Sequence, residues 1–357
     1  MNILVINPGA TSTKIALYNR EENLLTETIQ HRAAIIQSFS KVADQLDYRL
    51  EVIKETLDKH DVNFDEIAAI AARGGLLPPV ESGAYEVNEA MLDFLVNRPR
   101  VEHASNLGAI IADKLLKLCP PETKAYVYDP VTVDQFAPVS RISGLKGVER
   151  VSIGHALNMR AVAFHVANKL GKAYEDCHLI VAHLGGGNTI SVHQKGRMID
   201  SLSDDEGPFS TERTGELPVK SVMKLCYKHS EKEMERLRRQ VGGMYSYLGT
   251  NDARIVEERI KEGDQEAALV FEALSYQVAK GIGSLATALK GEVDGIILTG
   301  GLAFSTRLAE SVREKVDFLG PFFVVPGEKE MYALASGVTR VLEGVETSHV
   351  FKVESGE

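Results

Sequence analysis

The sequence predicts an α/β protein built from two duplicated domains with a cleft between them. Two observations indicate this fold class: a meander of three strands occurs twice, and helices alternate with strands after each copy. A chain of 357 residues is also long for one hydrophobic core and suits two domains of ordinary size. We therefore expect an N-terminal domain over residues 1–150, completed by a C-terminal helix within about 331–357, and a second domain over residues 151–330.

The first meander opens the chain. Two strand-like runs within Asn2–Tyr18 flank the loop NPGATSTK, and a third strand follows the turn NREEN. The two commonest phosphate loops lead from a strand into a helix, whereas this loop joins two strands. A phosphate held here would depend on backbone N–H groups and on the polar side chains of the loop, without a helix dipole. An ordinary Pro-Gly hairpin with a polar tip is the alternative.

Helices and strands then alternate through the first half. The segment SKVADQLDYRLEVIKETLDKH predicts a helix, because its apolar residues Val42, Leu46, Leu50, Ile53 and Leu57 share one helical face. A strand, EIAAIAARGG, ends in paired glycines. We expect the remaining elements to be a helix around residues 107–118, the strand KAYVYDP and a helix that begins near residue 155.

A second copy of the meander spans Leu179–Ser201, with the sequence LIVAHLGGGNTISVHQKGRMIDS. An offset of 176 residues places Val5 on Val181 and Gly9 on Gly185. Similar elements follow: helices within 219–289, the strand VDGIILTGG, the helix TRLAESVREKV, the strand FFVVP and a last helix near 331–342. Antiparallel meanders followed by crossover connections predict two mixed sheets.

Composition excludes several classes of partner. The net charge of −10 and a pI near 5.6 argue against nucleic acid or an anionic membrane as the main partner, because both attract basic surfaces. We find neither a signal peptide nor an apolar run of about 18 residues, the length a membrane span needs. Cys119, Cys177 and Cys226 are odd in number and lack a CxxC pattern, so we expect buried thiols in a cytoplasmic protein.

Paired hairpin loops across a cleft offer a reason for the duplication. Each loop could hold a terminal phosphate from its own side, and Gly300 and Gly301 would let a nucleotide approach the backbone. This arrangement resembles the superfamily of acetate and sugar kinases, Hsp70 and actin. The resemblance implies ribonuclease-H-like (actin-like ATPase) domains, of which the C-terminal one binds the nucleotide.

The resemblance is closest to the acetate kinase family, and within it to the butyrate kinases, over nearly the whole chain. The family opening N-x-G-x-x-S-x-K stands here as Asn7, Gly9, Ser12 and Lys14, with Ala10 where acetate kinases usually carry a hydroxyl. Further motifs that resemble the butyrate kinase versions, in chain order, are HASN, VYDPV, SIGHALN, AHLGGGN, EGPFSTERTGELP, ILTGG and VVPGEKE.

The resemblance implies roles for residues of the phosphate and metal sites. Asp129 and Glu330 match the two carboxylates that position Mg²⁺, although each could also be a turn or helix cap. His155 and His183 match histidines near the transferring phosphoryl group, although a lone histidine is more often a hydrogen-bonded core residue. The phosphate donors would be Asn7, Ser12, Lys14, Gly185, Gly186, Gly187 and Asn188.

Four further residues are assigned with alternatives. Arg213 matches an arginine that stabilises the transition state, and its alternative is a surface salt bridge to Glu212 or Glu216. Acetate kinases place a substrate arginine three positions before His-Gly-Gly. Here Ile70 takes that position, and Arg73, directly before Gly74, is the candidate for the carboxylate contact. Adenosine would contact the residues Asp252 and Arg254, which are also common at helix starts.

The implied reaction is reversible transfer of the γ-phosphoryl group of ATP to a short-chain fatty acid, butyrate or isobutyrate, with Mg²⁺ as cofactor. An acetate or propionate kinase is one alternative, and an ATP-dependent conformational switch of the Hsp70 or actin type is another. We expect no nucleic-acid or membrane partner, and the resemblance implies a homo-oligomer, at least a dimer.

Overall fold

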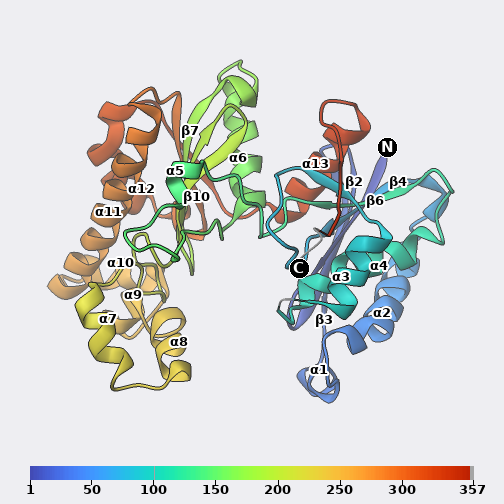
Figure 1. Cartoon of the computed structure of the whole chain (residues 1–357), viewed down its shortest axis with the longest axis horizontal. Helices are drawn as coiled ribbons and strands as arrows, with labels where there is room; N and C mark the ends of the chain where they lie inside the picture. Colours follow the sequence, from blue (N-terminus) through green and yellow to red (C-terminus); the bar gives the residue numbers. More distant parts are fainter. Residues whose placement is uncertain (100, 354–357) are drawn as a thin grey trace. The chain divides into compact units, whose positions relative to one another are not determined.

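The structure is a computed structural model that describes residues 1–99 and 101–353, and it divides into two compact units (Figure 1). Unit 1 comprises residues 1–134, 156–158 and those from 329 onward, and unit 2 comprises residues 135–155 and 159–328. The structure thus differs from the expected boundary at residue 150, because residues 135–150 belong to unit 2. Arg150 explains this placement: its guanidinium bonds to Asp200 at 2.9 Å and to Glu206 at 3.0 Å.

Unit 1 is built on a seven-stranded mixed sheet in the order β12-β5-β6-β4-β1-β2-β3. β1, β2 and β3 form the predicted antiparallel meander, while β4 and β6 add in parallel to β1. The strands are β1 Asn2–Pro8, β2 Ser12–Asn19, β3 Glu22–Gln30, β4 Ile67–Arg73, β5 Ala84–Glu86, β6 Lys124–Tyr128 and β12 His349–Val350.

Helices cover both faces of this sheet. Leu4, Ile6 and Ile70 point into a core with apolar residues of α2, α3 and α4, which lie together in Figure 1. α13 packs against β1, β2 and β4 but contributes nothing to that core, since alternate residues of a strand face opposite sides. The helices are α1 Ala33–Ser38, α2 Leu46–Lys59, α3 Glu89–Asn97, α4 Leu107–Leu116 and α13 Glu330–Leu342.

Unit 2 repeats the plan with a five-stranded sheet in the order β11-β10-β7-β8-β9. Its strands are β7 His178–His183, β8 Thr189–Gln194, β9 Arg197–Leu202, β10 Gly295–Gly300 and β11 Phe322–Pro326. In each unit the first strand of the meander lies between the second strand and a later parallel strand. The order β6-β4-β1-β2-β3 of unit 1 is therefore the order of unit 2, which confirms the predicted duplicated α/β fold.

Two cores sandwich the sheet of unit 2. Ile180, Ala182 and Leu298 pack with α11 and α12 on one face, while Leu179, Val181 and Ile297 pack with α6 on the other. The helices are α5 Pro138–Arg141, α6 Ala156–Lys169, α7 Val219–Cys226, α8 Glu231–Arg239, α9 Gly243–Leu248, α10 Ala253–Lys261, α11 Gln265–Ala286 and α12 Thr306–Val316. The first three residues of α6 cluster with unit 1 and the rest with unit 2.

Two details correct or limit the sequence-based expectations. Cys177 is buried, but Cys226 is exposed at the end of α7, so the expectation of buried thiols is wrong for that residue. Across residues 1–99 and 101–353, the helices lack the length and apolar character that crossing a membrane requires.

Candidate functional site

The predicted site residues fall into two groups, one in each unit. Unit 1 holds Asn7, Ser12, Lys14, Arg73, Asp129 and Glu330. Unit 2 holds His155, His183, Gly185, Gly186, Gly187, Asn188, Arg213, Asp252, Arg254, Gly300 and Gly301. Each group is described within its own unit.

In unit 1, three predicted residues stand in a row along one edge of the sheet. β1, β4 and β6 are parallel neighbours, and the register pairs Arg73 with Tyr128. Asn7, Arg73 and Asp129 therefore lie at the carboxyl ends of adjacent strands, which are spaced about 4.8 Å apart. Ligands of open α/β sheets bind at this kind of edge.

Glu330, the first residue of α13, joins this row. Its Oε2 accepts a hydrogen bond from Asn7 Nδ2 at 2.9 Å, and its Oε1 lies 3.8 Å from a terminal nitrogen of Arg73. The Arg73 side chain is only 14% exposed, and its other terminal nitrogen, NH1, is buried without a hydrogen-bond partner among the described residues. Arg73 thus keeps donor capacity for a further anion.

Asp129 is completely buried directly after β6. Its Oδ1 accepts a hydrogen bond from the Gly83 N–H at 2.7 Å. Its φ of +41° lies in the left-handed region, which costs a non-glycine residue about 1–2 kcal/mol. A carboxylate held in this conformation is fixed in position by its surroundings.

Asp129 and Glu330 fit the predicted Mg²⁺ by donor chemistry. Both offer carboxylate oxygens, the ligand type that Mg²⁺ prefers. Mg²⁺ is commonly held by one or two carboxylates, while water and substrate phosphates complete its octahedron. In the described part of the chain, no three His, Cys, Asp or Glu side chains cluster as a closed metal cage. The open type of site is therefore the one these residues can form.

The NPGATSTK loop connects β1 to β2 as a β-hairpin, as predicted. It is closed by a hydrogen bond from the Gly9 N–H to the Ser12 carbonyl at 2.8 Å. Thr13 is buried and Lys14 is exposed, because successive residues of β2 face opposite sides of the sheet. The Lys14 ammonium forms no ion pair within the described residues.

In unit 2, the two predicted histidines lie face to face. The rings of His155 and His183 are 3.9 Å apart at an angle of 12°. His155 Nδ1 is hydrogen-bonded to Thr189 Oγ1 at 3.0 Å, and His183 Nε2 lies 3.1 Å from Glu328 Oε1. Each ring of the stack is thus held by a polar partner of its own.

The glycine loop between β7 and β8 is fixed by Asn188, a buried residue. Asn188 Oδ1 accepts from the Gly185 N–H at 3.1 Å, and Asn188 Nδ2 donates to the Phe209 carbonyl at 2.8 Å. Gly187 lies against Arg213: a Cβ added to this glycine would stand 2.6 Å from Arg213 NH1. A side chain at this position would have to displace the Arg213 guanidinium.

Arg213 is held by an acidic residue that the sequence-based alternatives did not include. Its NH1 is paired with Asp204 in the segment SDDEG, rather than with Glu212 or Glu216. The side chain is 26% exposed, and its Nε is buried without a hydrogen-bond partner in the described part of the chain. The Arg213 backbone N–H donates to Ser210 Oγ at 3.0 Å. Arg213 is therefore held in orientation by Asp204 and still has a hydrogen-bond donor available for a ligand.

The expected nucleotide contacts differ in how firmly they are placed. Gly300 has a φ of +87°, and a Cβ there would stand 2.3 Å from the Leu184 carbonyl oxygen. Gly301 faces open space. Asp252 caps α10 and pairs with Arg254 at 2.6 Å, and this bond lowers the pKa of Asp252 to about 2. Apart from this pair, the described hydrogen bonds and ion pairs join neither residue to another predicted site residue.

Sequence reasoning missed the side chains that hold the predicted ones. Thr189, Asp204 and Glu328 orient His155, Arg213 and His183 respectively. Thr189 directly follows the motif AHLGGGN, Asp204 lies two residues before EGPFSTERTGELP, and Glu328 lies within VVPGEKE. The only signal in the sequence was a polar residue beside or within a motif. The sequence did not show which predicted residue each of these side chains would contact in the fold.

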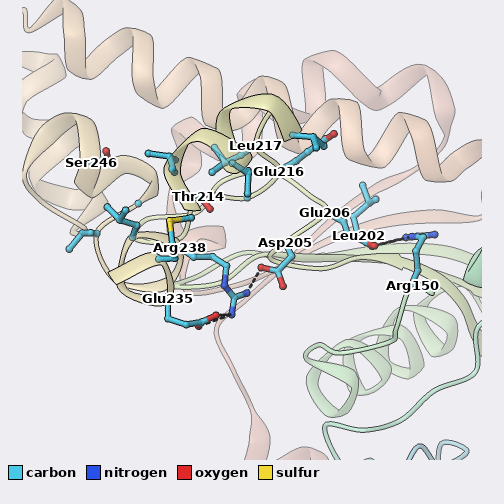
Figure 2. A pocket seen from close by; sticks show the side chains of 18 of the residues that line it. Arg150, Leu202, Asp205, Glu206, Thr214, Glu216, Leu217, Glu235, Arg238 and Ser246 are labelled. Atoms are coloured by element: carbon cyan, nitrogen blue, oxygen red, sulfur yellow. Dashed lines mark hydrogen bonds and ion pairs between the residues drawn. The ribbon is translucent and has the colours of Figure 1, made fainter. Parts of the chain in front are cut away.

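A cavity of about 1020 Å³ lies elsewhere in unit 2 (Figure 2). α7 and α8 line it together with the segment that follows Arg213, including Glu216 and Leu217. Figure 2 shows Arg238 between Asp205 and Glu235 at its wall, with both ion pairs drawn. Its lining includes none of the predicted site residues, so it is not the predicted phosphate site.

Solved structures with the same fold cover almost the whole chain. The acetate kinase of Porphyromonas gingivalis is 19% identical over 96% of this chain and 99% of its own, with a TM-score of 0.78. A propionate kinase from Francisella tularensis subsp. tularensis SCHU S4 is 18% identical over 94% and 98%, with a TM-score of 0.72. The acetate kinase of Entamoeba histolytica is 16% identical over 95% and 99%, with a TM-score of 0.75.

At these identities the solved structures establish the fold, and the family is established by sequence. The model of the acetokinase family matches residues 144–342, which is more than half of the chain. This range includes the stacked histidines, the glycine loop, Arg213 and Glu330. The chain therefore belongs to the acetokinase family.

Proposed function

We propose that the chain transfers the γ-phosphoryl group of ATP reversibly to the carboxylate of butyrate or isobutyrate, giving an acyl phosphate and ADP. Membership of the acetokinase family makes the chain a carboxylate phosphotransferase that uses ATP and ADP. The four-carbon acid, the Mg²⁺ ion and the roles of individual residues are the finer parts of the proposal.

The observation that carries the proposal is the position of Arg73. It stands at the carboxyl end of β4 between Asn7 and Asp129, and its buried NH1 has no partner among the described residues. A guanidinium with a free donor suits a carboxylate, which accepts hydrogen bonds in a planar arrangement. The segment after it is apolar: Leu77 is buried in the core, while Leu76 is half-buried and is the better candidate to contact an acyl chain.

The acceptor needs no general base, because a carboxylic acid is already ionised at neutral pH. Arg73 would hold its carboxylate, and the backbone N–H groups of the two glycine-containing loops would hold phosphate oxygens. Arg213, whose Nε has no partner within residues 1–99 and 101–353, would stabilise charge that develops on the transferring group. His155 would donate a hydrogen bond to the same group. Mg²⁺ held by Asp129 and Glu330 would neutralise charge on the phosphates.

Acetate or propionate kinase activity with the same mechanism is the second candidate. It is supported by the similar structures, which include two acetate kinases and a propionate kinase. The two candidates share every residue role given above except the shape of the acyl pocket. They are separated by the acid used, not by the reaction.

The decisive experiment is hydroxylamine trapping of the acyl phosphate. The purified chain is incubated with ATP, Mg²⁺ and one carboxylic acid at a time, from two to six carbons and including isobutyrate. Hydroxamate formed fastest with the four-carbon acids supports butyrate kinase activity. Hydroxamate formed fastest with acetate or propionate supports the second candidate, and ATP consumption without hydroxamate from any acid contradicts both.

A cytoplasmic homo-oligomer, at least a dimer, completes the proposal. It is supported by the apolar surface of α7, where Val219 and Met223 are exposed, and by Tyr227, which is exposed directly after this helix. Sedimentation equilibrium of the purified chain measures its mass against the 39.0 kDa of one copy. A mass of 39.0 kDa at micromolar concentration would contradict the oligomer.

A further inference from the structure

Arg49 of α2 is completely buried in unit 1 behind the NPGATSTK loop. Its Nε and NH2 donate to Gln45 Oε1 at 3.0 and 2.9 Å. NH1 donates to the Ser12 carbonyl at 3.2 Å and to Thr13 Oγ1 at 3.0 Å, and NH2 also donates to the Ala10 carbonyl at 3.2 Å. One guanidinium therefore holds three residues of the loop, Ala10, Ser12 and Thr13.

All of these acceptors are neutral. No carboxylate bonds to Arg49 anywhere in residues 1–99 and 101–353. Burial lowers the pKa of Arg49, but an arginine side chain stays protonated in proteins. A buried cation without a counter-ion is unfavourable, so an anion that binds nearby gains from it.

The loop carbonyls are turned inward. The Ala10 and Ser12 carbonyls accept from Arg49, and the Thr11 carbonyl accepts from the His31 N–H at 2.9 Å. In a planar trans peptide the N–H points opposite to the C=O, so the Thr11 N–H points away from Arg49. That N–H has no hydrogen-bond partner in the described part of the chain. The outer side of the loop therefore presents a free donor.

Thr13 links Arg49 to His31, which is also buried. Thr13 Oγ1 accepts from Arg49 and is also hydrogen-bonded to His31 Nε2, which lies 2.8 Å away. Burial, and then the charge of Arg49, lower the pKa of His31 to about 4. His31 is thus neutral at pH 7 and adds no second charge behind the loop.

We infer that Arg49 is the residue that positions the NPGATSTK loop for a phosphate group and supplies the buried positive charge that attracts it. The phosphate group is the missing counter-ion of Arg49, bound on the outer side of the loop. Placing ATP or an acyl phosphate there rests on the proposed function, whereas affinity for inorganic phosphate does not.

Gln45→Glu distinguishes this role from a purely structural one. The substitution keeps the size of the side chain and gives Arg49 a carboxylate partner in place, while the bonds from Arg49 to the loop remain possible. If Arg49 only supported the fold, Gln45→Glu would leave phosphate binding unchanged. If the charge of Arg49 attracts the phosphate, then Gln45→Glu, which neutralises that charge, weakens phosphate binding without lowering the melting temperature.

The test is titration of the ¹⁵N-labelled full chain with inorganic phosphate, followed by the amide signals of Gly9 and Thr11. The matched control is Gln37→Glu, the same change at an exposed position of unit 1. We expect the phosphate dissociation constant to rise at least about tenfold in Gln45→Glu and to stay at the wild-type value in Gln37→Glu. Arg49→Lys keeps a charge but loses the fork, so its phosphate affinity should also fall.

Two results would overturn the inference: equal phosphate affinity in both Gln→Glu variants, or no shift of Gly9 and Thr11 in the wild type. The hydroxylamine assay is scored separately. Failure to phosphorylate any acid, with phosphate binding still dependent on Gln45, would remove the proposed function and leave the role of Arg49 in place.

Discussion

Arg213 offers the sharpest prediction at the scale of single residues. Arg213→Ala should lower kcat about 10²- to 10³-fold and change ATP affinity little. The reason is that its Nε, which has no partner among the described residues, is expected to make its contact mainly in the transition state. Steady-state kinetics of acyl phosphate formation give kcat, and ATP binding is measured by calorimetry.

Arg238 is the matched control for that substitution. It pairs with Asp205, the neighbour of the residue that holds Arg213, but lies outside the predicted site. Arg238→Ala should leave kcat within a few-fold of the wild type. An Arg213→Ala enzyme that is equally active would exclude Arg213 from the mechanism.

Glu330 carries the second prediction at this scale. Glu330→Gln should raise the Mg²⁺ concentration needed for half-maximal activity, because an amide is a weaker ligand for a hard cation than a carboxylate. Asp129→Asn should act in the same direction. The measurement is a Mg²⁺ titration of activity at fixed ATP, with Glu343→Gln at the other end of α13 as the control. Unchanged titrations in both variants would contradict the metal assignment.

Single residues also mark where sequence reasoning stopped. Arg49 lies three residues after Leu46 and four before Ile53, so it stands on the apolar face of the helix that the sequence predicted. A lone arginine on such a face was a readable signal of a buried charge. The hydrogen-bond acceptors of Arg49 could not be predicted from the sequence. Ala10 and Ser12 are almost 40 positions away, and they accept through backbone carbonyls, which every residue has.

At the scale of an element, β8 carries a polar row on one face. Thr189, Ser191 and His193 alternate along the strand, and Ser191 Oγ lies 2.7 Å from His193 Nε2. Tyr174 bonds to the other ring nitrogen at 2.7 Å. Burial, and then the charge of Arg160, lower the pKa of His193 to about 3. This end of the sheet is therefore held by a neutral histidine.

That pKa predicts acid sensitivity. The unfolded chain takes up a proton on His193 below its ordinary pKa of about 6.5, while the folded chain does not until about pH 3. The lowered pKa of His193 should thus contribute nothing unfavourable to the free energy of unfolding above pH 6.5, where the histidine is neutral in both states. The free energy of unfolding should lose about 1.4 kcal/mol per pH unit as the pH falls toward 3.

Urea unfolding at pH 7.5, 6 and 5 measures this slope. His193→Gln should make it shallower than in the wild type, whereas His60→Gln, at an exposed position, should not. The comparison between variants isolates His193 from the carboxylates that also titrate. Equal slopes in all three proteins would exclude the buried neutral histidine.

Helices and strands with a clear hydrophobic pattern could be predicted closely. Short strands, which depend on pairing with a neighbouring strand, could not. The expected helix TRLAESVREKV and strand FFVVP coincide with α12 and β11. α3 was not predicted, and neither were β5 and β12, which have three and two residues. Such short strands exist because a neighbouring strand pairs with them, and local sequence carries little of that information.

At the scale of the whole molecule, the prediction concerns which acid is used. If the pocket is built for a four-carbon chain, acetate leaves two methylene positions unfilled. Each is worth about 1–3 kcal/mol of discrimination, so kcat/KM for butyrate or isobutyrate should exceed that for acetate by roughly 10²-fold or more. Kinetics with each acid under saturating ATP and Mg²⁺ measure the ratio.

Leu76→Ala tests the same pocket from the protein side. It should lower kcat/KM for butyrate more than for acetate, while Leu118→Ala, at an exposed site, should leave both unchanged. An acetate value equal to or above the butyrate value in the wild type would replace the butyrate assignment with the acetate kinase alternative.

The duplication was the part of the whole molecule that the sequence predicted best. The offset of 176 residues carries Asn2, the start of β1, onto His178, the start of β7. The sequence led us to expect that a C-terminal helix completes the first domain, but not that residues 135–150 join unit 2. These residues lack a strong pattern and are placed by ion pairs such as that of Arg150 with Glu206.

The interleaving has a consequence during synthesis. The helix α13 packs on β1, β2 and β4, but the ribosome makes it about 200 residues after β6. At roughly 5–20 residues synthesised per second, one face of the unit 1 sheet remains without α13 for about 10–40 s. All strands of unit 2 are complete before that helix emerges. A stalled or truncated nascent chain would therefore expose the first sheet to chaperones and to aggregation.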